Sequence, residues 1–260
     1  MHKPRIAIHK FSSCDGCQLA FLNLGEDLLA LFELAEVRHF AEAGPVDIEA
    51  EVDISFVEGS ISSAEELARI QRVRERSRYL VTIGACATAG GLQALRNLSA
   101  AGEWLASVYA TPAFIDTLAS VTPVREHVRV DLELWGCPVN ARQVLAAIPA
   151  LIEGVVPHEE HDRVCLECKR RLHMCVMVTR GLPCLGPVTR TGCGALCPGI
   201  GRDCYGCYGP SETPATAVLG RRYTELGLAP EQIARRFLSY NAAAPEFLEA
   251  GKSAGPRNDA

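Results

Sequence analysis

The chain has 260 residues and a formal net charge of −5, with 48% hydrophobic and 22% charged residues. These proportions are typical of soluble globular proteins and exclude a disordered or fibrous chain. The acidic balance disfavours nucleic-acid binding through phosphate contacts. The length predicts one large domain or two smaller ones. Cysteine is the unusual residue, because it occurs twelve times.

The interpretation of the cysteines depends on the compartment in which the chain works. Residues 1–10 show neither a secretory signal pattern nor a twin-arginine motif, and no window of about 20 apolar residues predicts a membrane span. We therefore expect a cytoplasmic protein with no membrane span. In that reducing environment many cysteines indicate metal binding or redox chemistry rather than disulfides.

The first part of the chain alternates between predicted strands and helices. Apolar runs predict strands at 5–9, 37–40, 52–57, 79–83 and 128–134. Helical spacing of apolar residues predicts helices at 18–32, 63–78 and 140–152. This alternation predicts an α/β domain with a parallel sheet and right-handed crossovers.

Four cysteines follow the ends of predicted strands. Cys14 and Cys17 come after the first strand, Cys86 after the fourth and Cys137 after the fifth. Because the carboxyl ends of parallel strands share one edge of the sheet, we expect these thiols to converge there. Four thiolates suit a [4Fe–4S] cluster or a tetrahedral zinc ion. Close backbone approach, with N–H donation to the sulfurs, is expected at the nearby glycines Gly16, Gly84, Gly90 and Gly91.

Two alternatives to this metal site stay open on the sequence alone. In the first, Cys86 and Cys137 are simply buried, as free cysteines often are. In the second, the loop with Ser12 and Ser13 after the first strand binds the phosphate of a flavin. No GxGxxG follows that strand, so NAD binding by the usual route is not expected.

The other eight cysteines lie close together, between residues 165 and 207. Their spacing is C-x2-C-x6-C-x8-C and then C-x3-C-x6-C-x2-C, which divides naturally into two quartets with one C-x2-C pair each. The intervening sequence is rich in glycine and proline, so we expect it to fold around inorganic centres. Two structural zinc ions are the alternative for this segment.

Three quartets account for all twelve cysteines. The sequence offers no nucleophile–base arrangement and no Walker motif, so three iron–sulfur clusters in a row describe an electron relay. A zinc-stabilised assembly protein without a redox role is the alternative from another class. After Pro210 the sequence predicts an amphipathic helix at 230–240, a flexible terminus at 251–260, and solvated arginine pairs at 221–222 and 235–236.

Several motifs resemble those of one known family. The segments CDGCQLAFLNL, VEGSIS, GACATAGG and LWGCPVN, with LPCLGP, GCGALCPG and CYGCYGP further on, are similar to the small subunit of [NiFe] hydrogenases. The similarity covers roughly residues 4–210. Within the family, the motifs most resemble the delta subunit of the cytoplasmic, NAD(P)-linked sulfhydrogenase type. It implies a flavodoxin-like, doubly wound domain at 1–155, a loop-rich iron–sulfur domain at 156–212, and a C-terminal helix with a flexible tail at 213–260.

The resemblance also implies three [4Fe–4S] clusters and their ligands. The first quartet, nearest the nickel–iron site of a partner large subunit, is Cys14, Cys17, Cys86 and Cys137. The second quartet, holding the outermost cluster, is Cys165, Cys168, Cys175 and Cys184. The third quartet, holding the middle cluster, is Cys193, Cys197, Cys204 and Cys207.

Two departures from the membrane-bound uptake branch of this family are informative. Cys165 stands where that branch carries a histidine, and Cys197 supplies a fourth thiolate where its middle cluster lacks one. We therefore expect a cubane rather than a [3Fe–4S] centre. An all-thiolate set favours potentials near the roughly −400 mV of plant-type ferredoxins, which suits exchange with nicotinamide.

The expected partners are a NiFe-containing large subunit and iron–sulfur and flavin subunits that bind NAD(P). The alternative within the family is a small subunit of a hydrogenase linked to F420 or to a heterodisulfide reductase. A relative of the cluster-bearing subunit of respiratory complex I is a third alternative. The eight extra cysteines and the wide spread of the first quartet count against it.

Glu58 is the one acidic residue singled out at the expected cluster edge, because it ends the third predicted strand. In a functional interpretation it lies near the first quartet and takes part in a proton route or in contact with the large subunit. In the alternative it is a solvated carboxylate at a strand end.

Overall fold

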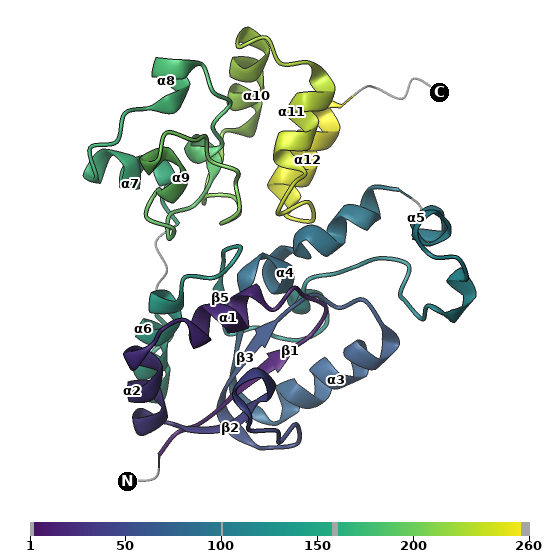
Figure 1. Ribbon diagram of the computed structural model, residues 1–260, viewed down its shortest axis with the longest axis vertical. Coiled ribbons are helices and arrows are strands. Elements are labelled where there is room, and N and C mark those ends of the chain that lie inside the picture. The colour runs from purple at the N-terminus through teal and green to yellow at the C-terminus, as the bar shows by residue number, and fades with distance from the viewer. Residues whose placement is uncertain (1–2, 100, 158–160, 256–260) are drawn as a thin grey trace. The chain divides into compact units, whose positions relative to one another are not determined.

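The computed structural model describes residues 3–99, 101–157 and 161–255 (Figure 1). The chain forms two compact units, unit 1 at Met1–His158 and unit 2 at Glu159–Ala260. The predicted segments 156–212 and 213–260 thus fall almost entirely within one unit.

Unit 1 is built on a five-stranded sheet with the order β2-β1-β3-β4-β5, and all four pairings are parallel. This order defines the flavodoxin-like, doubly wound α/β fold that the sequence predicted. The strands are β1 (Arg5–Lys10), β2 (Glu36–Phe40), β3 (Val52–Glu58), β4 (Ser77–Ile83) and β5 (Leu132–Leu134).

Helices and helical turns connect these strands. The α-helices of unit 1 are α1 (Gly16–Leu22), α2 (Glu26–Leu34), α3 (Ala64–Glu75), α4 (Gly84–Ala89), α5 (Ala101–Val108) and α6 (Ala141–Ile152). The 3-10 turns are η1 (Ala41–Ala43), η2 (Gly91–Leu98), η3 (Pro112–Phe114) and η4 (Val124–Glu126). Ser63 begins α3, because its side chain accepts a hydrogen bond from the N–H of Glu66 at 3.2 Å.

Two predicted elements differ from the structure. The single helix expected at 18–32 is two helices, since Gly25 adopts φ 61° and ψ −120°, a conformation that interrupts a helix. The strand expected at 128–134 is only the three residues of β5. Here the side chain of Asp131 accepts the N–H of Leu80 at 2.8 Å, in place of a strand carbonyl.

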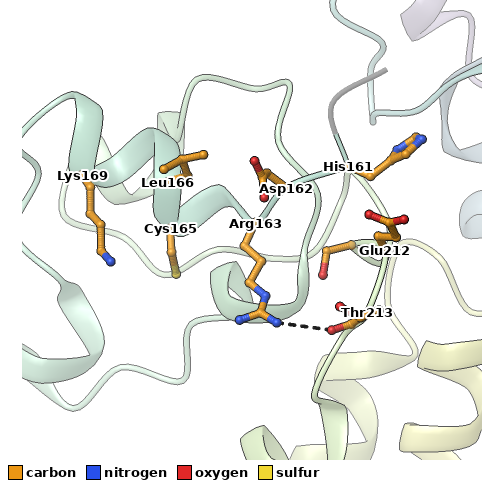
Figure 2. Close-up of a pocket in the computed structure, with 9 residues that line it drawn as sticks. His161, Asp162, Arg163, Cys165, Leu166, Lys169, Glu212 and Thr213 are labelled. Carbon is orange, nitrogen blue, oxygen red and sulfur yellow. Dashed lines mark hydrogen bonds between the residues drawn. The ribbon is translucent and has the colours of Figure 1, made fainter. Parts of the chain in front are cut away.

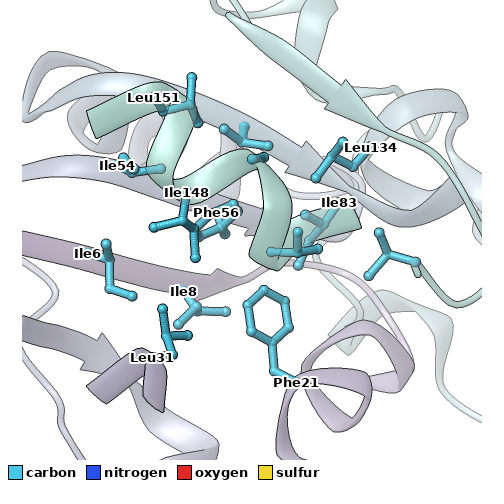
Figure 3. Packing of buried hydrophobic residues seen from close by; sticks show 14 of the residues in the cluster. Ile6, Ile8, Phe21, Leu31, Ile54, Phe56, Ile83, Leu134, Ile148 and Leu151 are labelled. Atoms are coloured by element: carbon cyan, nitrogen blue, oxygen red, sulfur yellow. The ribbon is translucent and has the colours of Figure 1, made fainter. Parts of the chain in front are cut away.

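Alternating residues of the strands fill a core on each face of the sheet. On one face, Ile54 and Phe56 of β3 pack with residues of α1, α2 and α6 (Figure 3). On the other face, Val57 packs with Ile70 and Val73 of α3. Burying each such side chain contributes about 1.5–3 kcal/mol, so this domain has an apolar core independent of metal.

Unit 2 contains short helices and loops around the cysteines, followed by three longer helices. They are α7 (Val164–Arg170), α8 (Val176–Arg180), η5 (Gly186–Val188), α9 (Leu196–Gly199), α10 (Thr216–Glu225), α11 (Pro230–Phe237) and α12 (Pro245–Ala254). The predicted helix at 230–240 corresponds to α11, whereas α10 and α12 were not predicted. Helix α12 occupies 251–254 of the expected flexible terminus, and 256–260 lie outside the described residues.

The three long helices share an aromatic core. Tyr223 of α10 contacts Phe237 of α11 with ring centroids 6.3 Å apart, and Phe237 contacts Phe247 of α12 at 6.0 Å. All three side chains are almost completely buried. In the described parts of the chain, no helix has the length and apolarity that crossing a membrane requires.

Candidate metal centres

The first quartet lies at the carboxyl edge of the sheet in unit 1. Cys14 and Cys17 follow β1, with Cys17 inside α1. Cys86 lies in α4, directly after β4, and Cys137 follows β5. Segments far apart in the sequence thus bring four thiols to one edge, as the strand order requires.

The pKa values of Cys17, Cys86 and Cys137 are raised at this edge. Burial raises the pKa of the Cys17 thiol, and the neighbouring thiols of Cys86 and Cys137 raise it further. Burial raises the pKa of Cys86 to about 12, with contributions from Cys137 and Cys14. Four free thiolates are therefore disfavoured here, and cationic iron or zinc is the kind of partner that lets such a set ionise.

Glycines leave room for the sulfurs, as the sequence predicted. A Cβ added to Gly84, whose φ is +84°, would overlap the Sγ of Cys17. One added to Gly91, at φ +56°, would lie 2.5 Å from the Sγ of Cys86. A Cβ on Gly16 would lie 3.4 Å from the Sγ of Cys14. Gly84 and Gly91 are thus needed because the backbone lies directly against the sulfurs of Cys17 and Cys86.

N–H groups that reach these sulfurs belong to Val139 and Leu92 rather than to the predicted glycines. Val139 N–H donates to the Sγ of Cys17 at 3.4 Å. The N–H of Leu92 donates to Cys86 and opposes the rise of its pKa. The loop is further fixed by Ala85 N–H, which donates to Gly136 O at 2.7 Å.

Glu58 is buried rather than solvated, because only 2% of the residue is exposed. Its Oε1 accepts the N–H of Cys17 and its Oε2 the N–H of Gln18, each at 3.1 Å. Burial raises the pKa of Glu58, and these two hydrogen bonds oppose the rise. The carboxyl group therefore holds the turn that carries a cysteine of the first quartet.

The second quartet gathers around α7 and α8. Burial raises the pKa of Cys168 to about 11, and the thiols of Cys165, Cys184 and Cys175 raise it further. A Cβ added to Gly186 would lie 3.4 Å from the Sγ of Cys184 and 3.7 Å from that of Cys165. Gly186 thus lies beside two sulfurs of this quartet, at ordinary van der Waals distance.

The third quartet adjoins the second. Burial raises the pKa of Cys204 well above its usual value, with contributions from Cys184 and Cys207. Burial also raises the pKa of Cys193, with a contribution from Cys197. Cys204 N–H donates to the Sγ of Cys184 at 3.2 Å, so a direct hydrogen bond connects the two quartets.

The C-terminal helices support these cysteine loops, which the sequence did not indicate. Arg236 of α11 forms an ion pair with Asp203 and donates to Pro183 O, so it is not the solvated residue that was expected. Asn241 donates to Gly206 O at 2.8 Å. Burial raises the pKa of Tyr223, and the charges of Cys184 and Cys204 raise it further.

An open pocket of about 320 Å³ lies beside the second quartet (Figure 2). Cys165 lines it together with charged residues of both signs: Asp162, Arg163, Lys169 and Glu212. Arg163 donates to Thr213 O at 3.4 Å across its edge. Cys165 is therefore accessible from a polar surface, unlike the buried Cys184.

In the described part of the chain, no three His, Cys, Asp or Glu side chains converge as ligands of a single metal ion.

Comparison with known proteins agrees with this architecture. Residues 14–164 match the family described as NADH ubiquinone oxidoreductase, 20 Kd subunit. Sulfhydrogenase 2 subunit delta from Pyrococcus furiosus is 33% identical over 91% of this chain and 98% of its own length. A vhu subunit of the F420-non-reducing hydrogenase from Methanocaldococcus jannaschii is 30% identical over 80% of this chain and 82% of its own.

A solved structure supports the same assignment. A chain of an NAD+-reducing [NiFe]-hydrogenase in the H2-reduced state is 32% identical, with a TM-score of 0.56. It covers 61% of this chain and 96% of its own length. The fold and the cysteine-rich edge define a redox subunit of the iron–sulfur type. The chain belongs to the family of the 20 Kd subunit and, within it, to the small subunits of [NiFe] hydrogenases.

The residue ranges of these matches address the alternative that the chain is a relative of the cluster-bearing subunit of complex I. The family match ends at residue 164, before the eight cysteines that begin at Cys165. The sulfhydrogenase delta subunit, in contrast, matches almost the whole chain. A relationship to the 20 Kd subunit therefore covers unit 1, and the hydrogenase relationship extends to unit 2.

Proposed function

We propose that the chain is the electron-transfer small subunit of a cytoplasmic [NiFe] hydrogenase. It would hold three [4Fe–4S] clusters, one on each quartet, and connect the NiFe site of a large subunit with an NAD(P)-linked flavin module. The observation that carries the proposal is the convergence of Cys14, Cys17, Cys86 and Cys137 at one edge of the sheet, together with eight more cysteines in unit 2, where Cys204 N–H donates to the Sγ of Cys184. The clusters would supply one-electron transfer.

The chain itself positions the ligands and buries three of them, Cys17, Cys184 and Cys204. The loops after β1, β4 and β5 hold the first quartet, and Glu58 fixes the turn at Cys17. In unit 2 the thiols of Cys184 and Cys204 are buried. Cys197 completes the third quartet, which supports a cubane there.

The proposed partners follow from the relatives. A NiFe-containing large subunit would bind the chain, and iron–sulfur and flavin subunits would exchange electrons with NAD(P). The open pocket beside Cys165 supports an exit near the second quartet, because it gives a partner access to that ligand. The second candidate is a hydrogenase linked to F420 or to a heterodisulfide reductase. The similarity to a component of an F420-non-reducing hydrogenase favours its heterodisulfide-reductase branch.

Purification of the intact complex without oxygen tests the proposal. We expect the chain to co-purify with a larger, nickel-containing subunit and to support hydrogen-dependent reduction of NAD+ or NADP+. Reduction of a heterodisulfide, with no reduction of nicotinamide, would instead assign it to the second candidate. A complex without nickel and without hydrogen oxidation would contradict both.

The Glu58→Gln variant tests the role of Glu58 in turnover. The variant keeps the size of the side chain, but its amide NH2 meets one of the two N–H donors at Cys17 and Gln18. We expect a lower rate of hydrogen oxidation by the complex, with unchanged iron content. The matched control is Glu42→Gln, which changes an exposed carboxylate of the same unit. Unchanged hydrogen oxidation in Glu58→Gln would remove Glu58 from the mechanism.

A further inference from the structure

In sequence, Glu167 lies between two cysteines of the second quartet. Its side chain, however, contacts the loop that carries Cys193 of the third quartet. Glu167 lies in α7, inside the C-x2-C pair of the second quartet. Its Oε1 accepts the N–H groups of Gly192 at 2.9 Å and Gly194 at 3.1 Å. Its Oε2 accepts the N–H of Ala195 at 3.1 Å. One carboxylate thus receives three backbone hydrogen bonds from the loop that carries Cys193.

The conformation of this loop depends on an anion. Gly194 and Ala195 both adopt left-handed conformations, with φ of +69° and +53°. Successive backbone N–H groups in such turns form a concave site for a negative charge. Alanine enters the left-handed region only at an energetic cost, which the hydrogen bonds to Glu167 offset.

The carboxylate is also close to a ligand sulfur. Glu167 Oε2 lies 3.9 Å from the Sγ of Cys193. A negative charge at this distance opposes the addition of an electron to a centre bound by that sulfur. The three backbone donors fix the charge there, so its effect does not depend on a mobile side chain.

We propose that Glu167 is a positioning residue that shapes the Cys193 loop and lowers the reduction potential of the cluster on the third quartet. Because it belongs to the C-x2-C pair of the second quartet, it couples the binding loops of two neighbouring clusters. The effect on potential rests on the proposed cluster function, whereas the ordering of the loop does not.

The test compares two variants of the full-length chain that remove the same charge. Glu167→Gln keeps the side-chain size but replaces one acceptor oxygen by a donor. Glu231→Gln changes an exposed carboxylate on α11. Each protein is analysed for iron, for the midpoint potentials of its clusters by EPR-monitored titration, and for amide hydrogen exchange of residues 192–195.

We expect wild type and Glu231→Gln to protect the amides of Gly192, Gly194 and Ala195. Glu167→Gln should expose them and shift one cluster potential to a more positive value, with the other two unchanged. Full iron content with three unchanged potentials in Glu167→Gln would overturn the effect on potential. Rapid exchange of these amides in the wild type would overturn the positioning role, and this measurement needs no variant. Wild-type protein without iron would contradict the proposed function instead, while its amide exchange still tests the loop.

Discussion

Gly84→Ala is expected to remove the cluster of the first quartet and with it about four of about twelve irons per chain. The added Cβ would overlap the Sγ of Cys17, and the φ of +84° is unfavourable for any residue with a Cβ. Cys17 is buried and cannot move outward without leaving the core around Phe21. Iron analysis and hydrogen-dependent acceptor reduction by the complex check this expectation, and both should fall.

The control for this substitution is Gly220→Ala in α10. Gly220 has no atom within 4 Å of an added Cβ and no positive φ. In a helix interior, alanine is favoured over glycine by up to about 1 kcal/mol, so this variant should keep all its iron. A Gly84→Ala variant with full iron content and normal activity would show that the Cys17 sulfur is not confined in this way.

Cys184→Ala is expected to stop electron transfer without stopping chemistry at the partner's hydrogen-splitting site. Cys184 is a buried member of the second quartet and accepts the N–H of Cys204. Its loss should remove about four irons per chain. Hydrogen-dependent reduction of the acceptor should then fall to background, whereas isotope exchange between hydrogen and water needs no electron relay and should persist.

Val178→Ala is the control for this substitution, because Val178 is 80% exposed on α8 in the same unit. We expect it to leave both iron content and acceptor reduction unchanged. If Cys184→Ala also reduced the acceptor at the normal rate, the second quartet would not lie on the electron path, and the proposed relay would be wrong.

The position of the first quartet could be predicted from the sequence because it follows from strand topology. Cys86 and Cys137 each come directly after an apolar run, and parallel strands bring such positions to one edge. The close approach of Gly84 and Gly91 to the sulfurs was predicted for the same reason. In contrast, the burial of Glu58 depends on the turn at Cys17 and could not be derived from its place at a strand end.

Features that depend on tertiary contacts could not be predicted. Just before the short strand β5, the side chain of Asp131 accepts the N–H of Leu80, a tertiary contact that the apolar pattern does not indicate. The role of Glu167 depends on the left-handed turn at Ala195, a residue that rarely adopts it. The aromatic packing of Tyr223 depends on three helices, of which the sequence indicated one.

The most direct test of the account is the metal and acid-labile sulfide content of the protein purified without oxygen. Three cubanes predict about twelve irons and twelve sulfides per chain. Two or three zinc ions without sulfide would mean that the quartets are structural, and would contradict the electron relay.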